Sequence, residues 1–192
     1  MREPAIPYLD RPLPYVDSLG TRAASDINLV VIHCTELPDL ATARTFGERL
    51  HYPQSATGNS GHWYIDRDGR CERWVDERRI AHHVRGLNAH SIGIELVNRG
   101  RWPDWLDSRH QAMDEAYPDA QIATLIALLN DLHHRLDHLR NIAGHEDLDT
   151  EHVAASDNPQ LVVARKRDPG PQFPWPRVLA GCRLARLQVP PQ

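Results

Sequence analysis

The chain is 192 residues long, with 41% hydrophobic and 25% charged residues, which is enough for one compact domain with a sizeable core. A formal net charge of -4 provides no basic field of the kind that holds a phosphate backbone, so nucleic acid is not expected as a partner. No apolar run is long enough for a membrane span or a signal-peptide core, so the chain is expected in the cytoplasm, with non-classical export or phage lysis left open.

The first predicted strand is the run at residues 27–34, which is rich in β-branched side chains and is typical of a strand buried on both faces. His33 lies near its carboxyl end. Asp39 can then cap a helix that reaches about Leu50. The stretch 55–61 is rich in Ser, Gly and Asn, which indicates a surface loop.

A hairpin is predicted next, because two short apolar runs at 62–65 and 71–75 flank the turn sequence at 66–69. Residues 91–97 predict a fourth strand. Residues 99–118 contain prolines but also Trp102 and Trp105, which is typical of an ordered surface loop.

Apolar residues three and four apart follow Pro118 and predict a helix that packs on the sheet and ends before Gly144. The remaining chain reads as loop around a short apolar run at 161–164, and residues 168–175 are too rich in proline for regular structure. We therefore expect an N-terminal extension at 1–25, a domain at 26–180 and a C-terminal tail at 181–192. This order predicts a single α/β domain with a mixed sheet packed by helices.

The chain has twelve histidines, and most have ordinary explanations. His134 and His138 are four apart on the long helix, but their charged neighbours favour a solvated face over a metal site. His33 differs, because an imidazole that ends an apolar strand lies at the carboxyl edge of the sheet, where open α/β folds place their sites. A satisfied core histidine is the ordinary alternative.

His145 and Asp168 are the other candidate metal ligands, because each lies beside a residue that shapes the backbone, Gly144 and Pro169. Two imidazoles and a carboxylate suit zinc and leave one tetrahedral position open. Spacing alone does not predict this triad. The competing zinc pattern at 145–149 resembles a metalloprotease motif but ends in Asp149 and has Gly144 at its start, which disfavours it.

Six short motifs, in this order and spacing, carry a family resemblance. They are Val30-Val31-Ile32-His33-Cys34, Gly61-His62-Trp63-Tyr64-Ile65 with the turn at 66–69, Ala81-His82-His83 leading to Asn88, Ser91-Ile92-Gly93-Ile94-Glu95-Leu96, Gly144-His145, and residues 166–175. Together they resemble the N-acetylmuramoyl-L-alanine amidases of the AmpD-like and peptidoglycan-recognition group. The resemblance implies a mixed sheet with one Zn²⁺ in a surface groove, held by His33, His145 and Asp168.

The same resemblance implies that Glu95 is the general base and that Lys166 stabilises the oxyanion. Lys166 is also the only lysine among 22 basic residues, an observation independent of the resemblance. His62, His83 and Asn88 match positions near the groove, where substrate contact or support of the site is expected. Two departures are Cys34, after the first ligand, and Gly61, where some phage enzymes carry a tyrosine; those enzymes also have a cysteine ligand where this chain has Asp168.

The expected function is therefore hydrolysis of the amide bond between N-acetylmuramic acid and L-alanine, either in peptidoglycan during cell wall degradation or in anhydro-muropeptides during recycling. No obligate protein partner is expected. The alternative is a non-catalytic peptidoglycan-binding module of the same superfamily, but such modules have typically lost a metal ligand, and all the matching positions are present here.

Overall fold

The computed structural model describes residues 6–187, which form a seven-stranded mixed sheet with the strand order β1-β4-β3-β5-β2-β6-β9 and a separate β7-β8 hairpin. The strands are β1 (Leu9–Asp10), β2 (Leu29–Cys34), β3 (Trp63–Ile65), β4 (Cys71–Arg73), β5 (Ser91–Leu96), β6 (Asn141–Gly144), β7 (His152–Ala154), β8 (Val162–Ala164) and β9 (Ala185–Arg186). The helices are α1 (Leu40–Gly47), α2 (Asp119–Arg135), α3 (His145–Leu148) and α4 (Trp175–Gly181), with short 3-10 turns at Val16–Ser18, Ala24–Asp26 and Asn88–His90. The predicted mixed α/β sheet is confirmed.

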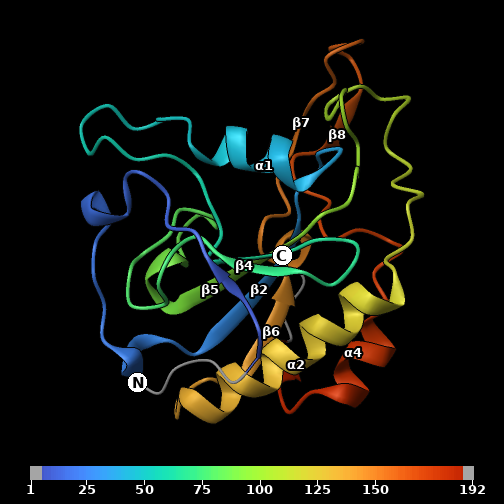
Figure 1. Cartoon of the computed structure of the whole chain (residues 1–192). Helices are drawn as coiled ribbons and strands as arrows, with labels where there is room; N and C mark the ends of the chain where they lie inside the picture. Colours follow the sequence, from blue (N-terminus) through green and yellow to red (C-terminus); the bar gives the residue numbers. More distant parts are fainter. Residues whose placement is uncertain (1–5, 188–192) are drawn as a thin grey trace.

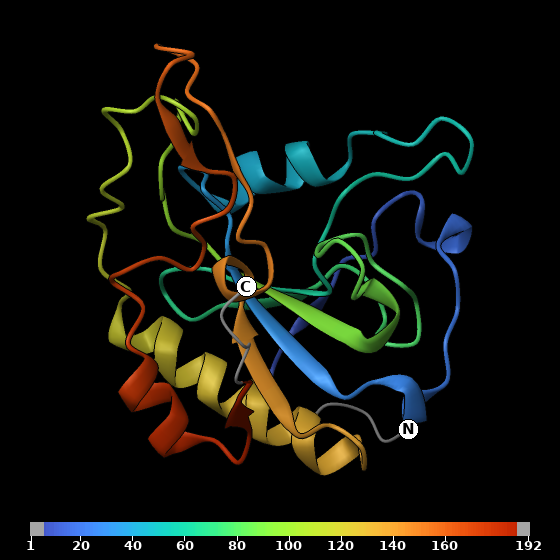
Figure 2. The same cartoon turned by 180° about the vertical axis from the view of Figure 1, so that it is seen from behind.

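Strand β2 lies in the interior of the sheet, where it pairs in parallel with β5 on one side and with β6 on the other. Side chains alternate along a strand, and those at Ile32 and Ile94 belong to the same apolar cluster as the buried face of α2. Helices α2 and α4 cover this face together, while α1 lies on the other side of the sheet (Figures 1 and 2). One face of β2 is therefore core, which leaves the opposite face, with His33, for a site.

Helix α1 begins where the sequence predicts, because the Asp39 side chain accepts a hydrogen bond from the backbone N–H of Thr42 (2.7 Å). Its buried residues pack into a second cluster that includes Tyr64 and Trp74, whose rings are stacked. This cluster fixes α1 beside the carboxyl ends of the central strands.

Both terminal segments contribute to the packed fold. Strand β1 pairs with β4, β9 pairs with β6, and the side chains of Leu13, Leu19 and Leu184 are buried. The predicted extension at 1–25 and tail at 181–192 thus contain strands of the main sheet, and their outermost residues, 1–5 and 188–192, lie outside the described part.

Three segments differ from the sequence-based expectation. The long helix ends at Arg135, and residues 141–144 form strand β6, so His145 follows a strand and starts α3 instead of following a helix. Residues expected to be loop form the β7-β8 hairpin. The proline-rich segment is irregular as predicted through Pro174 and then leads into α4, a helix that was not expected, with Pro176 in its first turn, where a missing N–H costs nothing. Within residues 6–187 no helix is long and apolar enough to cross a bilayer.

Candidate metal centre and its cavity

A row of functional side chains crosses three neighbouring strands. His33 of β2 pairs with Glu95 of β5, which in turn pairs with Tyr64 of β3. Paired residues of parallel strands project from the same face, so these side chains share the face opposite α2. All three line one cavity of about 660 Å³.

His33, His145 and Asp168 converge at this cavity although they lie far apart along the chain. Asp168 Oδ2 lies 2.8 Å from His33 Nδ1 and 3.1 Å from His145 Nδ1, and one ligand atom from each residue lies within 4.8 Å of the other two. All three residues are buried. His33 ends β2, His145 starts α3 after β6, and Glu146 N–H donates to the Asp168 carbonyl (2.9 Å), which joins the third residue to the second.

The protonation of this cluster suits a cation. Burial, with the neighbouring His145, lowers the pKa of His33 to about 4, so its ring is neutral at pH 7 and a ring nitrogen has a free lone pair. Burial alone would raise the pKa of Asp168, but the charge of His145 and hydrogen bonds from both imidazoles hold it well below its usual range. The cluster therefore brings together the ionised carboxylate of Asp168 and the neutral imidazole of His33.

Glu95 is half-buried beside this cluster. Burial, and next the negative charge of Asp168, raises its pKa well above its usual value. Space for the Glu95 side chain depends on Gly61, since a Cβ at Gly61 would lie 2.9 Å from Glu95 Cγ. The glycine noted as a departure in the sequence is thus the residue that accommodates the carboxyl group.

Lys166 lines the same cavity, and the segment that leads to it is anchored by a buried ion pair. Arg101 donates to both carboxylate oxygens of Glu36, at 2.7 and 2.9 Å, and its Nη1 donates to the Ala164 carbonyl (2.8 Å). No local sequence pattern predicts this pair, because a bidentate contact between residues 65 apart depends on the tertiary fold.

Arg101→Ala is expected to lower the free energy of unfolding by about 3 kcal/mol, because it leaves the buried Glu36 carboxylate without its partner. Chemical denaturation of the two proteins measures the difference. Arg78→Ala is the control, since Arg78 makes a similar bidentate contact to Asp76 where both side chains are open to solvent. Equal stabilities of the Arg101 and Arg78 variants would contradict the importance of the buried pair.

The three remaining predicted site residues occupy different depths. His83 and Asn88 line the cavity. His62 is fully buried, is absent from the cavity lining, and packs edge-on against His83 with ring centroids 5.5 Å apart. The structure thus brings His83 and Asn88 to the site and places His62 behind His83.

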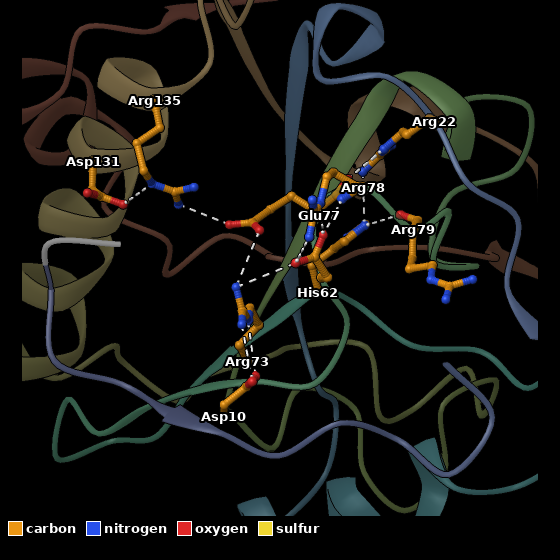
Figure 3. A network of polar contacts seen from close by, with 10 residues as sticks. Asp10, Arg22, His62, Arg73, Glu77, Arg78, Arg79, Asp131 and Arg135 are labelled. Atoms are coloured by element: carbon orange, nitrogen blue, oxygen red, sulfur yellow. Dashed lines mark hydrogen bonds and ion pairs between the residues drawn. The ribbon is translucent and has the colours of Figure 1, made fainter. Parts of the chain in front are cut away.

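His62 belongs to a polar network that ties the segment after β4 to the sheet (Figure 3). Gly93 N–H donates to His62 Nδ1 (3.0 Å), so the proton of the neutral ring is on Nε2, which donates to the Arg79 carbonyl (3.1 Å). The Arg22 Nη2 atom lies 3.0 Å from the same His62 Nε2, and the Arg22 Nε atom donates to the Glu77 carbonyl. The network continues through the Glu77 carboxylate to Arg135 of α2 (3.0 Å).

The protein is expected to lose stability in acid through His62. Burial, and next the charge of Arg22, lowers its pKa from 6.5 to about 3, whereas in the unfolded chain the ring takes up a proton near pH 6.5. The free energy of unfolding should therefore fall as the pH decreases from about 6.5 towards 3, by up to about 1.4 kcal/mol per pH unit. Urea unfolding across this range, compared with His62→Asn, tests this; equal pH dependence of the two proteins would contradict it.

The family comparison decides what kind of protein carries this arrangement. Residues 23–171 match the family model described as N-acetylmuramoyl-L-alanine amidase. The chain belongs to the N-acetylmuramoyl-L-alanine amidase family. The matched region contains every predicted site residue, so the resemblance inferred from the six motifs is confirmed.

Individual proteins similar in sequence or structure to this chain are also N-acetylmuramoyl-L-alanine amidases. N-acetylmuramoyl-L-alanine amidase AmiD of Escherichia coli (strain K12) is 36% identical over 120 residues, which cover 56% of this chain and 37% of AmiD, so the chain matches little more than a third of that relative. The chain is also similar to a structure of AmiD from E. coli in complex with the substrate anhydro-N-acetylmuramic acid-L-Ala-D-gamma-Glu-L-Lys, with a TM-score of 0.63 and 28% sequence identity. The superposition covers 85% of this chain and 60% of the AmiD chain. An AmpD structure has a TM-score of 0.64 and 27% identity, with 91% and 94% covered.

Proposed function

We propose that this chain is a zinc-dependent amidase that hydrolyses the bond between N-acetylmuramic acid and L-alanine in peptidoglycan or in soluble muropeptides. The observation that carries the proposal is the convergence of His33, His145 and Asp168 on one point of a cavity that also holds Glu95 and Lys166. The substrate named in the AmiD complex supports the choice of bond.

The residues present fit a zinc ion. Asp168 Oδ1 is buried and has no hydrogen-bond partner among the described residues, which is costly for a carboxylate oxygen unless a cation compensates. Two imidazoles and one carboxylate are a common ligand set of catalytic zinc, which keeps its fourth position free of protein ligands. When bound, the zinc supplies a Lewis acid that polarises a carbonyl oxygen and lowers the pKa of water.

Glu95 is assigned as the general base and acid. Its raised pKa suits a group that takes a proton from water at neutral pH and then delivers it to the nitrogen of the departing alanine. Both transfers require only one carboxyl group, and the absence of a Cβ at Gly61 leaves room for its side chain. Removing that group should therefore stop turnover without removing a metal ligand.

Lys166 is assigned to the oxygen of the scissile carbonyl. As negative charge develops there, the Lys166 ammonium group donates a hydrogen bond and balances the charge. An arginine would place a broader planar group in this position, and the chain has arginine at every other basic residue. Asn88 and His83 are assigned to the cavity wall against which the substrate lies, and His62 supports that wall from behind.

The test is to incubate the zinc-loaded protein separately with anhydro-muropeptides and with purified sacculi, and to identify the products by mass. We expect free stem peptide that begins with L-alanine, and no release after treatment with a chelator. Binding of either substrate without any cleavage would instead support the non-catalytic peptidoglycan-binding alternative. The ratio of the two cleavage rates identifies the preferred substrate.

A further inference from the structure

The second ring nitrogen of His33 has a specific partner. His33 Nδ1 faces Asp168, while Nε2 lies 3.0 Å from Nδ1 of His83. A ring nitrogen that binds a metal has no proton, so a neutral His33 that uses Nδ1 as its ligand atom carries its proton on Nε2. With a metal on Nδ1, His33 therefore donates this hydrogen bond and His83 Nδ1 accepts it, whereas without a metal the Nδ1 proton is shared with Asp168.

The remaining hydrogen bonds of His83 run in the same direction. Since its Nδ1 is an acceptor, the neutral His83 ring carries its proton on Nε2, which lies 3.2 Å from Ser91 Oγ. The Ser91 hydroxyl in turn lies 2.9 Å from the Leu87 carbonyl, which can only accept. The chain of donors thus leads from His33 through His83 and Ser91 to the backbone, and no atom in it is required to donate twice.

His83 is also held in place by its surroundings. The Asn88 side-chain oxygen accepts the backbone N–H groups of His83 (3.0 Å) and Val84 (2.8 Å). The His83 ring packs against strand β5 at Gly93. Only glycine fits there, because a Cβ at position 93 would lie 2.6 Å from His83 Cγ. Asn88 and Gly93 therefore define where the His83 imidazole lies relative to His33.

We propose that His83 is a positioning residue that fixes the tautomer and ring orientation of His33 for metal binding, and that Asn88, Ser91 and Gly93 serve this role by holding His83. The inference rests on the metal site assigned under the proposed function. A hydrogen bond from the second nitrogen of a ligating histidine usually goes to a carboxylate, a backbone carbonyl or water, and here a neutral imidazole takes that place.

The test measures zinc affinity without any substrate, by competition with a chromophoric chelator. His83→Ala is expected to weaken zinc binding about 10- to 100-fold, the usual cost of losing a partner of a metal-ligating histidine. His83→Asn is expected to restore most of the affinity, because the asparagine oxygen can accept from His33 Nε2 near the position of the lost Nδ1. His138→Ala, which removes an exposed imidazole, is the matched control and should leave affinity unchanged.

Thermal unfolding of the metal-free variants separates loss of metal binding from loss of the fold. If His83→Ala destabilises the metal-free protein, His83→Leu replaces it, because leucine keeps the bulk but cannot accept a hydrogen bond. His83→Leu is then expected to bind zinc about 10- to 100-fold more weakly than His83→Asn, and equal affinities of these two variants would overturn the proposal. Unchanged zinc affinity in His83→Ala, with a raised KM for muropeptides, would overturn the proposal and leave His83 only its place in the wall that contacts the substrate. A chain that binds zinc in this pattern but cleaves nothing would refute the amidase function alone.

Discussion

Glu95→Gln is expected to reduce the rate of muropeptide cleavage by about 10²- to 10⁴-fold while zinc affinity stays unchanged. Glutamine has nearly the same shape as glutamate, so it fits the space that Gly61 leaves, but the amide cannot take up and release the proton. The loss should appear in kcat, since the proposed role of Glu95 lies in proton transfer and not in substrate binding.

Glu48→Gln is the matched control, because Glu48 is an exposed carboxylate at the end of α1 that pairs with Arg44, one turn earlier. It should cleave at the rate of the unsubstituted protein. A Glu95→Gln protein that retains a tenth or more of the original kcat would contradict the proposed role of Glu95, because a carboxylate that takes no part in proton transfer would leave kcat nearly unchanged.

Asp168→Ala is expected to abolish cleavage and to weaken zinc binding by more than about 100-fold. Loss of a direct ligand should cost more than loss of a residue that merely orients one. The substitution also removes the only carboxylate between the two imidazoles, to which both Nδ1 atoms are directed. Isothermal titration with zinc, together with a rate measurement, gives both quantities.

Asp168→Cys distinguishes the loss of a ligand from general damage to the site. A thiolate binds zinc well, and the family resemblance implies a cysteine ligand at this position in some phage enzymes. The cysteine variant should therefore bind zinc far more tightly than the alanine variant. Equally weak binding by both variants would show that Asp168 acts on the fold of the site and not as a ligand.

The sequence predicted the long elements well, because their patterns are local. The apolar run ending at His33, the Asp39 cap and the helix after Pro118 all depend on neighbours within a few residues, and each appears in the structure. Strand β6 was missed because it has only four residues and becomes a strand by pairing with β2, more than a hundred residues earlier. A short element that depends on a distant partner leaves little local signal.

The candidate site shows the same limit. Residue type and position singled out His33, but nothing in the spacing linked it to Asp168, 135 residues away, and only the family resemblance joined them. The role of the two glycines that make room for the site was missed, although Gly61 and Gly93 left a signal: a glycine inside or beside a strand often marks close approach of another group. In both cases that group is a side chain of the site, Glu95 or His83.

The most direct measurement is X-ray diffraction at the zinc absorption edge from crystals of the zinc-loaded protein. We expect one strong anomalous peak within bonding distance, about 2.0–2.2 Å, of nitrogen atoms of His33 and His145 and of an Asp168 oxygen, with no fourth side chain bound. A peak at other residues, or a fourth protein ligand that closes the site, would contradict the proposed hydrolase.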